Sequence, residues 1–296
     1  MLNLDLYLDS KRKLINAHLR EFLQGASKSK RLVEAMRYSL MAGGKRLRPV
    51  LCLVAAEVVG GQNSDMLRAA CAIEMIHTYS LIHDDLPVMD NDAMRRGKPT
   101  CHIAFDEATA LLAGDALLTL AFQILSAVEI KNDSQALKWI RVLHRIAHAA
   151  GYQGMIEGQM RDIDAEDRLI SLKELRKFHA LKTGALIEAA VYAGAVLGGG
   201  NTEQLEQLGI YAQNIGLAFQ VKDDILNVEG DPKLLGKAVG TDKVRKKNTY
   251  PSLMGLKESK SFAKKLVNQA LQAIGSFNDR AEPLRAIANY IIQRKR

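Results

Sequence analysis

Two pairs of adjacent aspartates are the residues in this chain that could most directly bind a cation. The first pair, Asp84 and Asp85, follows the apolar run 73–82 and is followed in turn by Asp90 and Asp92. A helix over the apolar run would end at the pair, where the partial negative charge of a helix C-terminus disfavours each carboxylate by up to ~1 kcal/mol. A bound cation would relieve this repulsion, and oxygen ligands of this kind select Mg²⁺ or Ca²⁺ over zinc.

The second pair, Asp223 and Asp224, ends another strongly apolar run, 208–221, and Gln220 lies one turn before it. Asn227 stands four residues after Asp223 and therefore shares its helix face. Two buried helices that end in facing aspartate pairs would hold several cations between them. Because Mg²⁺ prefers few protein carboxylates together with substrate phosphate oxygens, the expected ligand is a diphosphate. The alternative is two unrelated helix ends with solvated acids, which the basic segments beside both pairs disfavour.

The composition predicts a large hydrophobic core and an anionic ligand. The 296 residues are 48% hydrophobic, and the formal net charge is +8 with an isoelectric point of about 9.3. Basic chains often meet nucleic acid, anionic lipid or phosphorylated small molecules. Aromatic residues make up only 5%, so the stacking platforms that nucleic acids need are scarce. We therefore expect no nucleic-acid partner.

The cysteines and the N-terminal segment indicate a cytoplasmic protein. Cys52, Cys71 and Cys101 are far apart and odd in number, which fits neither a disulfide framework nor a paired metal-binding motif. The N-terminal segment alternates charged and apolar residues, unlike a signal peptide. No apolar run approaches the ~18 residues that span a bilayer, so we expect no membrane insertion.

Apolar residues at helical spacing predict an all-α fold in a single domain, residues 1–296. The helices are expected over residues 4–24, 28–41, 49–60, 65–85, 103–128, 134–160, 171–197, 202–229, 250–274 and 281–293. No linker rich in glycine or serine divides the chain. Two irregular charged stretches, 86–100 and 230–249, interrupt the helices, and loops on a rigid helical scaffold often carry function.

Five motifs in a fixed order give the chain a specific resemblance to the trans-prenyl diphosphate synthase family. They are "GGKRLRP" (43–49), "LIHDDLPVMDNDAMRRGKPTCH" (81–102), "HALKTGALI" (179–187), "GLAFQVKDDILN" (216–227) and "KKNTYP" (246–251). The resemblance covers residues from about 30 to about 255 and resumes at "YIIQRKR" (290–296). Within the family, the chain is most similar to the bacterial farnesyl diphosphate synthase type (geranyltranstransferase).

The resemblance implies a bundle of about ten or more helices around a deep central cavity, the isoprenoid synthase fold, and usually a homodimer. It implies Mg²⁺-dependent head-to-tail (1'-4) condensation of isopentenyl diphosphate with dimethylallyl or geranyl diphosphate. The product would be farnesyl diphosphate for isoprenoid biosynthesis. About three Mg²⁺ ions, replaceable by Mn²⁺, would act as Lewis acids on the departing diphosphate. The apolar helix wall would hold the prenyl tail and exclude water from the allylic cation.

The same resemblance assigns roles to individual residues. The metal ligands are Asp84 and Asp90 on one side of the allylic diphosphate and Asp223 on the other, with Asp85 and Asp224 supporting them. Near the allylic cation lie the carbonyl of Lys182, Thr183 and Gln220. The allylic diphosphate is bound by Arg95, Lys182, Lys237 and Lys247. Isopentenyl diphosphate is bound without metal by Gly44, Lys45, Arg48, His77 and Arg96, because cationic side chains can neutralise a diphosphate directly.

Tyr79 and Ser80 are the candidates for setting product length. Tyr79 lies five residues before Asp84, about 7.5 Å deeper along the helix, and Ser80 lies one turn before Asp84 on nearly the same face. By resemblance, an aromatic ring at position 79 stops the growing tail at fifteen carbons. The alternative is that Tyr79 is an ordinary core residue, whose truncation would lower stability without changing the product.

Three further features are expected to matter less. Asn227 replaces the aspartate that the second motif commonly carries, and an amide is a weaker metal ligand that can still hydrogen-bond a metal-bound water. His144 and His148 have the i,i+4 spacing of a metal site but are expected on a solvated helix face. A run of acids is expected to form a solvated loop, so that Asp162→Asn should do little. The run consists of Asp162, Asp164, Glu166 and Asp167.

Four other functions remain open from the sequence. A geranyl or geranylgeranyl diphosphate synthase would share every motif and differ only in product length. A class I terpene cyclase ionises the same diphosphates, but it needs no isopentenyl site and therefore no Lys45, Arg48, His77 and Arg96. A non-catalytic partner subunit would not need intact aspartate pairs. A basic bundle that binds membranes or RNA would bind polyanions with strong salt dependence.

Overall fold

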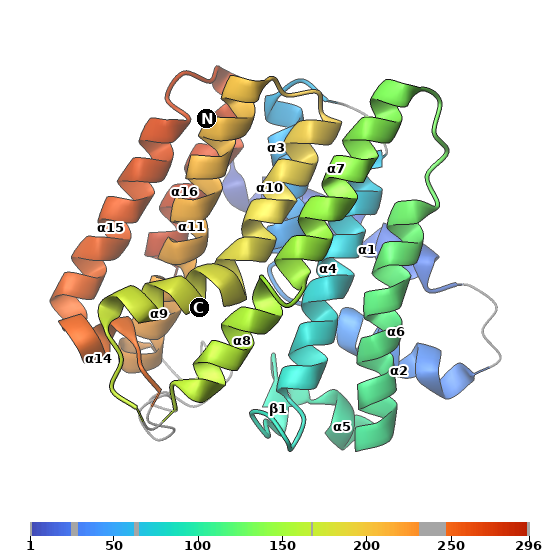
Figure 1. Cartoon of the computed structure of the whole chain (residues 1–296), viewed down its shortest axis with the longest axis vertical. Helices are drawn as coiled ribbons and strands as arrows, with labels where there is room; N and C mark the ends of the chain where they lie inside the picture. Colours follow the sequence, from blue (N-terminus) through green and yellow to red (C-terminus); the bar gives the residue numbers. More distant parts are fainter. Residues whose placement is uncertain (1, 25–28, 62–64, 167, 231–246, 295–296) are drawn as a thin grey trace.

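The computed structural model describes residues 2–24, 29–61, 65–166, 168–230 and 247–294, which form helices and one short β-hairpin (Figure 1). The elements are α1 (Leu4–Phe22), α2 (Lys30–Leu40), α3 (Leu47–Val58), α4 (Asp65–Asp84), β1 (Met94–Arg95), β2 (Lys98–Pro99), α5 (Cys101–Ala104), α6 (Glu107–Ser126), α7 (Asp133–Ala150), α8 (Met155–Asp164), α9 (Leu172–His179), η1 (Ala180–Gly184), α10 (Ala185–Leu197), α11 (Thr202–Glu229), α14 (Tyr250–Met254), α15 (Leu256–Ala273), η2 (Asp279–Ala281) and α16 (Glu282–Gln293). The predicted all-α fold is confirmed, whereas the deep central cavity stays a prediction.

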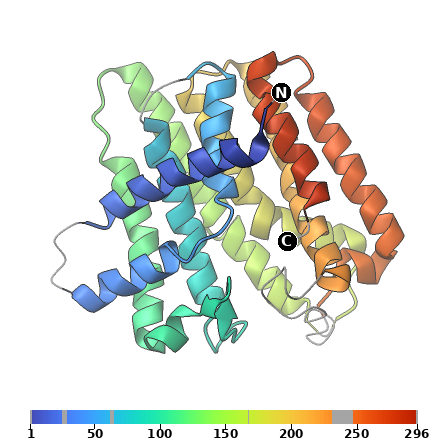
Figure 2. The same cartoon turned by 180° about the vertical axis from the view of Figure 1, so that it is seen from behind.

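The helices α4 and α11 run through the middle of the bundle (Figure 1, Figure 2). Helix α4 packs against α3, α6 and α10, and α11 packs against α10 and α15. Both were expected to be central because their sequences are apolar on most faces, and buried apolar side chains from Ile15 to Ile291 form one cluster around them. The C-terminal ends of α4 and α11 lie at the same end of the molecule, the lower end in both views. This arrangement directs both aspartate pairs toward one region.

Local sequence signals start several of these helices. Ser171 and Glu174 form a capping box at the start of α9. Asn201 and Gln204 cap α11 in the same reciprocal way, which satisfies backbone N–H groups that have no partner inside the helix. Pro251 occupies the first turn of α14, where its missing N–H is not needed. The caps fix where these helices begin, and thus the register in which α11 presents the acids near its end.

Two predicted helices are broken by glycine. The run expected over 134–160 is divided into α7 and α8, and a Cβ at Gly154 would lie 2.3 Å from the Ala149 carbonyl oxygen. The run expected over 250–274 is divided into α14 and α15 at Gly255, whose φ of 86° is a conformation that other residues rarely adopt. Apolar spacing continues through both breaks, so the pattern alone did not reveal them.

The helical run from α9 to α10 contains a π-helical turn, η1, at the position of two predicted site residues. The three elements follow one another without a gap, and η1 holds Lys182 and Thr183. A π turn changes the α-helical repeat locally, and such turns often occur at functional sites. The uninterrupted α-helix expected over 171–197 is therefore replaced by one whose register shifts at these two residues.

Two helical runs, α6 and the run Leu172–Leu197, are long and apolar enough to span a membrane by length and composition alone. Neither run agrees with the expectation that no apolar run approaches the length of a membrane span. The run Leu172–Leu197 belongs to the core, with 67% of its most apolar window buried, whereas the corresponding fraction in α6 is 39%. Because Leu111 and Leu112 of α6 are exposed, this helix presents an apolar face that the rest of the described chain does not cover.

Candidate active site

The loop after α4 folds back onto the end of that helix. Asp84 is the last residue of α4, and the backbone N–H of Asp90 donates to its carbonyl oxygen over 2.8 Å. The N–H of Asp92 donates to the Asp85 carbonyl oxygen over 3.2 Å, and Asn91 between them takes a left-handed φ of 51°. The loop therefore brings the carboxylates of Asp84 and Asp90 close enough to interact electrostatically.

Asp84 shows the electrostatic character of this cluster. Burial raises the pKa of its carboxyl group to about 6, and the neighbouring charges of Asp90 and Asp85 push the pKa in the same direction. The Lys182 ammonium group opposes the shift but does not cancel it. A carboxyl group in this state favours a bound proton or a bound cation, which is the property that the sequence pattern indicated.

A β-hairpin that the sequence analysis did not anticipate presents two arginines within the stretch 86–100. Strand β1 pairs with β2 through Arg95 and Lys98. Arg96 and Gly97 form the two-residue turn, with φ of 54° and 74°, as a type I′ turn requires. The hairpin fixes the directions of Arg95 and Arg96 relative to the end of α4.

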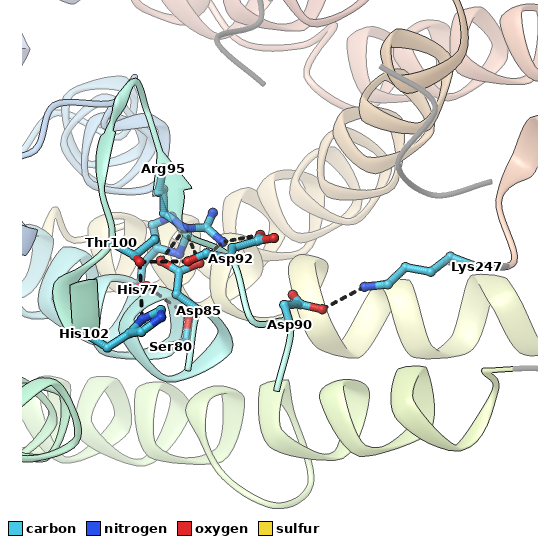
Figure 3. A network of polar contacts seen from close by, with 9 residues as sticks. All are labelled: His77, Ser80, Asp85, Asp90, Asp92, Arg95, Thr100, His102 and Lys247. Carbon is cyan, nitrogen blue, oxygen red and sulfur yellow. Dashed lines mark hydrogen bonds and ion pairs between the residues drawn. The ribbon is translucent and has the colours of Figure 1, made fainter. Parts of the chain in front are cut away.

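Arg95 makes a bidentate contact with Asp85, as Figure 3 shows. Its Nε lies 2.8 Å from both carboxylate oxygens and its Nη2 lies 2.6 Å from Oδ1. Asp85 is 3% exposed, and burial raises its pKa against the opposing effect of Arg95. The geometry fits the supporting role expected for Asp85, because the pair ties the hairpin to the helix end. Arg95 directs these donors to Asp85, so its expected contact with the allylic diphosphate stays a prediction.

The second aspartate pair is connected to the π turn by a chain of hydrogen bonds. The Thr183 hydroxyl donates to Gln220 Oε1 over 3.0 Å, and Gln220 Nε2 donates to Asp224 Oδ1 over 2.9 Å. The backbone N–H of Tyr250 donates to Asp224 Oδ2 over 3.0 Å. Asp224 is buried and thereby holds η1, α11 and the start of α14 together, which fits its expected supporting role.

Asp223 is paired with an arginine that the sequence analysis missed. The Arg294 Nη2 lies 2.6 Å from Asp223 Oδ1 and 3.0 Å from the Phe219 carbonyl oxygen. The Arg294 guanidinium also stacks 4.3 Å from the centre of the Phe219 ring. The signal available in the sequence was the return of the family resemblance at residues 290–296, which include three cations. The C-terminal segment therefore belongs to the site.

Two lysines connect the acids of the site across the bundle. The Lys247 Nζ lies 3.1 Å from Asp90 Oδ1 (Figure 3). Asp90 belongs to the first aspartate motif, whereas Lys247 lies after the second. The Lys182 Nζ lies 2.5 Å from Asp162 Oδ2 and also lowers the pKa of Asp84. Lys182 from η1 and Lys247 from the segment before α14 therefore both reach the acids around the first motif and Asp162.

The expectation that Asp162 lies in a solvated loop is wrong. Asp162 is part of α8, its side chain is 16% exposed, and it is paired with Lys182. Burial acts to raise its pKa, but the charge and hydrogen bond of Lys182 lower the pKa overall. Gly158, one turn earlier, allows this approach, because a Cβ there would lie 2.2 Å from the Lys182 backbone nitrogen. The signal in the sequence was Gly158 itself, because an isolated glycine inside a helical pattern can mark close packing.

A second, cation-rich cluster lies beside the first motif. A Cβ at Gly44 would lie 2.5 Å from the Arg96 guanidinium carbon, and Arg96 donates a hydrogen bond to the Gly43 carbonyl oxygen. Burial holds the pKa of His77 well below its usual value, and the charges of Arg48 and Arg96 lower it further. The structure thus brings together four of the five residues expected to bind isopentenyl diphosphate, which are Gly44, Arg48, His77 and Arg96.

Two of these cations also lie near the second motif. The Lys45 Nζ lies 5.7 Å from the centre of the Phe219 ring. Burial lowers the pKa of Arg48 to about 10, while the charges of Glu74 and Asp223 oppose the shift. The Arg48 Nε is buried and has no hydrogen-bond partner among the described residues. Since buried donors are nearly always satisfied, this atom is available to a partner that the described protein atoms do not supply.

Of the two chain-length candidates on α4, Tyr79 is buried and Ser80 is half-buried. Tyr79 is 6% exposed, and its ring packs edge-on against His83 with 5.6 Å between ring centres. The Ser80 hydroxyl donates to the His77 carbonyl oxygen over 3.0 Å. Both the chain-length role and the core role of Tyr79 are compatible with this placement. The remaining candidate, Lys237, lies outside the described residues.

The carboxylates do not form a complete metal site by themselves. Within the described ranges, no group of three or more His, Cys, Asp or Glu side chains is arranged to hold a metal ion. His144 and His148 are exposed, as expected, with 6.3 Å between their ring centres. Any metal bound at Asp84, Asp90 or Asp223 would therefore need further ligands from water or substrate.

Comparison with known proteins identifies the family. The polyprenyl synthetase family matches residues 29–289. The chain is 47% identical to the heterodimeric geranylgeranyl pyrophosphate synthase large subunit 1, chloroplastic, of Arabidopsis thaliana, over 98% of this chain and 79% of that protein. Most of the similar curated proteins are likewise named geranylgeranyl pyrophosphate or diphosphate synthases.

Two solved structures are similar over almost their whole length. An FPP/GFPP synthase from Zymomonas mobilis is 41% identical, with a TM-score of 0.86 over 98% of this chain and 99% of that chain. The geranylgeranyl pyrophosphate synthetase from Pyrococcus horikoshii Ot3 is 32% identical, with a TM-score of 0.88 over 98% of each chain. The chain therefore belongs to the polyprenyl synthetase family, and it is a prenyltransferase that elongates prenyl chains head to tail.

Proposed function

We propose that the chain condenses isopentenyl diphosphate with dimethylallyl or geranyl diphosphate and releases farnesyl diphosphate (FPP). The observation that carries this proposal is the presence of two clusters of charged side chains with different character. One is acidic: Asp84 and Asp90 lie together at the end of α4, Asp223 lies near the end of α11 at the same end of the molecule, and we propose that they hold a metal-bound diphosphate. The other is a cationic site without carboxylate ligands and contains Arg48, His77 and Arg96. An enzyme that joins two diphosphate substrates needs both.

The acidic residues fit Mg²⁺ as the cofactor. Mg²⁺ is usually bound by one or two carboxylates together with waters and substrate phosphate oxygens, and Asp84 and Asp90 offer two carboxylates from one folded loop. Asp223 offers a third carboxylate, from α11, once Arg294 releases its contact with Asp223 Oδ1. About three ions held in this way would supply Lewis-acid stabilisation of the departing diphosphate.

The neighbouring residues orient and protect the reacting allylic group. Asp224 holds Gln220, and Gln220 holds the Thr183 hydroxyl, so that two polar oxygens are fixed beside the π turn. Oxygen dipoles in this position would stabilise a positive charge that develops on the allylic carbon. The isopentenyl double bond then attacks, and the released diphosphate takes the proton. This route needs no side-chain base.

The names of the relatives support a different product more strongly than FPP. Most of those proteins are named as geranylgeranyl synthases, and geranylgeranyl diphosphate is therefore the second candidate product. Two observations favour FPP: the buried aromatic ring of Tyr79 five residues before Asp84, and the likeness to an FPP/GFPP synthase. A terpene cyclase is disfavoured because it has no use for the cationic site.

One assay separates these functions. Purified protein is incubated with Mg²⁺, labelled isopentenyl diphosphate and either dimethylallyl or geranyl diphosphate, and the dephosphorylated products are separated by chain length. Products of fifteen carbons support the proposal, and products of twenty carbons support the second candidate. Cyclised hydrocarbon, or no elongation at all, contradicts both.

Replacing Tyr79 by Ala is expected to lengthen the product to twenty carbons or more. The ring closes the space beneath the growing tail, and its removal opens that space. Because Tyr79 is also a core residue, the change is expected to lower the free energy of unfolding by about 3–5 kcal/mol. Chain-length analysis and thermal denaturation measure the two effects separately. Tyr79→Phe keeps the ring and should keep the product, whereas a folded Tyr79→Ala enzyme that still stops at fifteen carbons would place the floor elsewhere.

Replacing Lys45 by Ala is expected to raise the KM for isopentenyl diphosphate by about 10-fold or more and to change the KM for geranyl diphosphate much less. Loss of one charge-assisted contact weakens binding by about 1.5–3 kcal/mol. Steady-state kinetics with each substrate varied in turn measure the two constants. Lys98→Ala, on the exposed hairpin, is the matched control. A larger effect on the geranyl KM would show that the two sites are exchanged.

We further propose that the protein is a homodimer that buries the apolar faces of α6 and α7. Helix α7 follows α6 in the chain, and each exposes apolar side chains: Leu111 and Leu112 on α6, and Leu137 and Ile140 on α7. Contiguous exposed apolar patches often mark protein interfaces. Sedimentation velocity at micromolar concentration tests this, and a monomer there would contradict it.

A further inference from the structure

Arg46 is a buried arginine at the cationic site to which no substrate contact has been assigned. It is the N-cap residue of α3, it takes a left-handed φ of 53°, and its side chain is 1% exposed. Its Nη1 donates to Glu74 Oε1 over 2.6 Å and its Nε to Asn16 Oδ1 over 3.0 Å, while Nη2 donates to the Leu40 carbonyl oxygen. One side chain therefore ties α1, the end of α2 and the centre of α4 to the loop 41–46.

This loop carries residues that are proposed to bind isopentenyl diphosphate. Lys45 precedes Arg46 and lies against the Phe219 ring, and Arg48 follows it by two residues with its Nε buried and unsatisfied among the described residues. On the other side of the loop, Arg96 donates to the Gly43 carbonyl oxygen. Arg46 thus anchors the loop from inside the bundle, while its neighbours Lys45 and Arg48 extend toward the site.

Glu74, the partner of Arg46 in the buried pair, lies on α4, the helix that also carries His77 of the cationic site. It lies three residues before His77 on α4, and its side chain is 2% exposed. Its carboxylate is the leading neighbouring charge that supports the protonated forms of both Arg48 and Arg96. The pair is therefore coupled to the cationic site in two ways, through the backbone of the loop and through charge.

Stability alone does not explain why such a pair is buried. Removing two charges from water carries a desolvation penalty that their attraction barely offsets, and well-packed apolar side chains of similar volume are often equally stable. Apolar side chains could not, however, make three directed hydrogen bonds to three different helices. The forked geometry of the guanidinium group is suited to fixing one loop conformation.

We propose that Arg46 and Glu74 are a positioning pair, which holds the loop 41–46 in the conformation that presents Lys45 and Arg48 to isopentenyl diphosphate. The proposal rests on the assignment of that ligand to the cationic site. It differs from a simple electrostatic role, in which Glu74 would merely reduce the positive charge of the site. The two roles predict opposite effects when the charge of Glu74 is removed.

Three variants distinguish the roles: Arg46→Met, Glu74→Gln and the double variant. If the pair positions the loop, each should raise the KM for isopentenyl diphosphate by about 10-fold or more, because small displacements of binding groups have effects of this size. The KM for geranyl diphosphate should change by less than about 2-fold. If the pair only tunes charge, Glu74→Gln should lower the isopentenyl KM, and the double variant, with unchanged net charge, should return to the wild-type value. Either of these last two results overturns the proposal.

Two further variants keep the test decisive if a buried change prevents folding. Asn16→Ala removes only the acceptor of the Arg46 Nε and should raise the isopentenyl KM selectively by a smaller factor; an unchanged KM in this folded variant contradicts the proposal. Glu57→Gln breaks the Lys11–Glu57 pair, which also joins α1 to α3, and should lower the melting temperature without a selective change in KM. A wild-type protein that fails to elongate refutes the proposed function, whereas an active wild type with unaffected variants refutes only the positioning pair.

Discussion

Asp84→Asn is expected to lower kcat by about 100-fold or more. Asp84 ends α4 beside Asp90. The pKa of its carboxyl group is raised to about 6, because burial outweighs the opposing charges of Lys182 and Arg95. A diphosphate leaving group needs charge stabilisation that develops in the transition state, and an amide at this position is a much weaker metal ligand than a carboxylate. The loss should therefore appear in kcat more than in the KM of either substrate.

The same substitution is expected to leave the fold intact or to stabilise it. A carboxyl group whose pKa is raised in the folded state prefers to be neutral there, so its charged form weakens folding above pH 6. A neutral Asn removes this effect. Thermal denaturation at pH 7 without Mg²⁺ measures it, and single-turnover kinetics measure the chemical step. Asp133→Asn, an exposed acid in the first turn of α7, is the control. Near-normal turnover of Asp84→Asn would end the metal-site interpretation.

Asp162→Asn is expected to lower kcat/KM for the allylic substrate by about 10-fold to 100-fold, which corresponds to the ~1.5–3 kcal/mol of a hydrogen bond to a charged group. Lys182 lies between Asp162, which it contacts, and Asp84, whose pKa it lowers. Without Asp162, the ammonium group is free to move toward Asp84, where it would compete with a metal ion. The geometry thus reverses the expectation from the sequence that this substitution does little.

The expected signature of the Asp162 variant is a higher Mg²⁺ requirement. Activity is measured as a function of Mg²⁺ concentration for the wild type, Asp162→Asn and Asp164→Asn. Asp164 lies two residues further along α8 and is exposed, so the control removes a charge from the same helix without touching Lys182. If the two variants behave alike, Asp162 has no special role and the Lys182 pair is only structural.

The sequence could predict the parts of the site that depend on local pattern. Apolar runs that end in Asp84 and Asp223 indicated buried helices with acids at their ends, and the capping box at Ser171 marked the start of α9. These features depend on helix periodicity and capping, which act between near neighbours.

The parts that could not be predicted depend on contacts between distant segments. Asp162 and Lys182 are twenty residues apart, and Arg294 reaches Asp223 across 71 positions. The π turn at Lys182 has no signature in apolar spacing, because the face of the helix changes only locally. Gly158 carried information in the sequence, but its meaning became visible only when α8 was seen to pack against η1.

The β-hairpin strictly limits the number of residues between its two arginines and the segments on either side. Its register pairs Met94 with Pro99 and Arg95 with Lys98, so the turn has no residue to spare. Consecutive arginines serve different ends of the site, since Arg95 contacts Asp85 and Arg96 contacts the loop at Gly43. A single-residue insertion or deletion here would shift the register, so that Arg95 and Arg96 could not both keep their partners, and both clusters would be disturbed at once. The connection between α6 and α7, residues 127–132, carries none of the candidate site residues, so a change in its length is expected to cost far less activity.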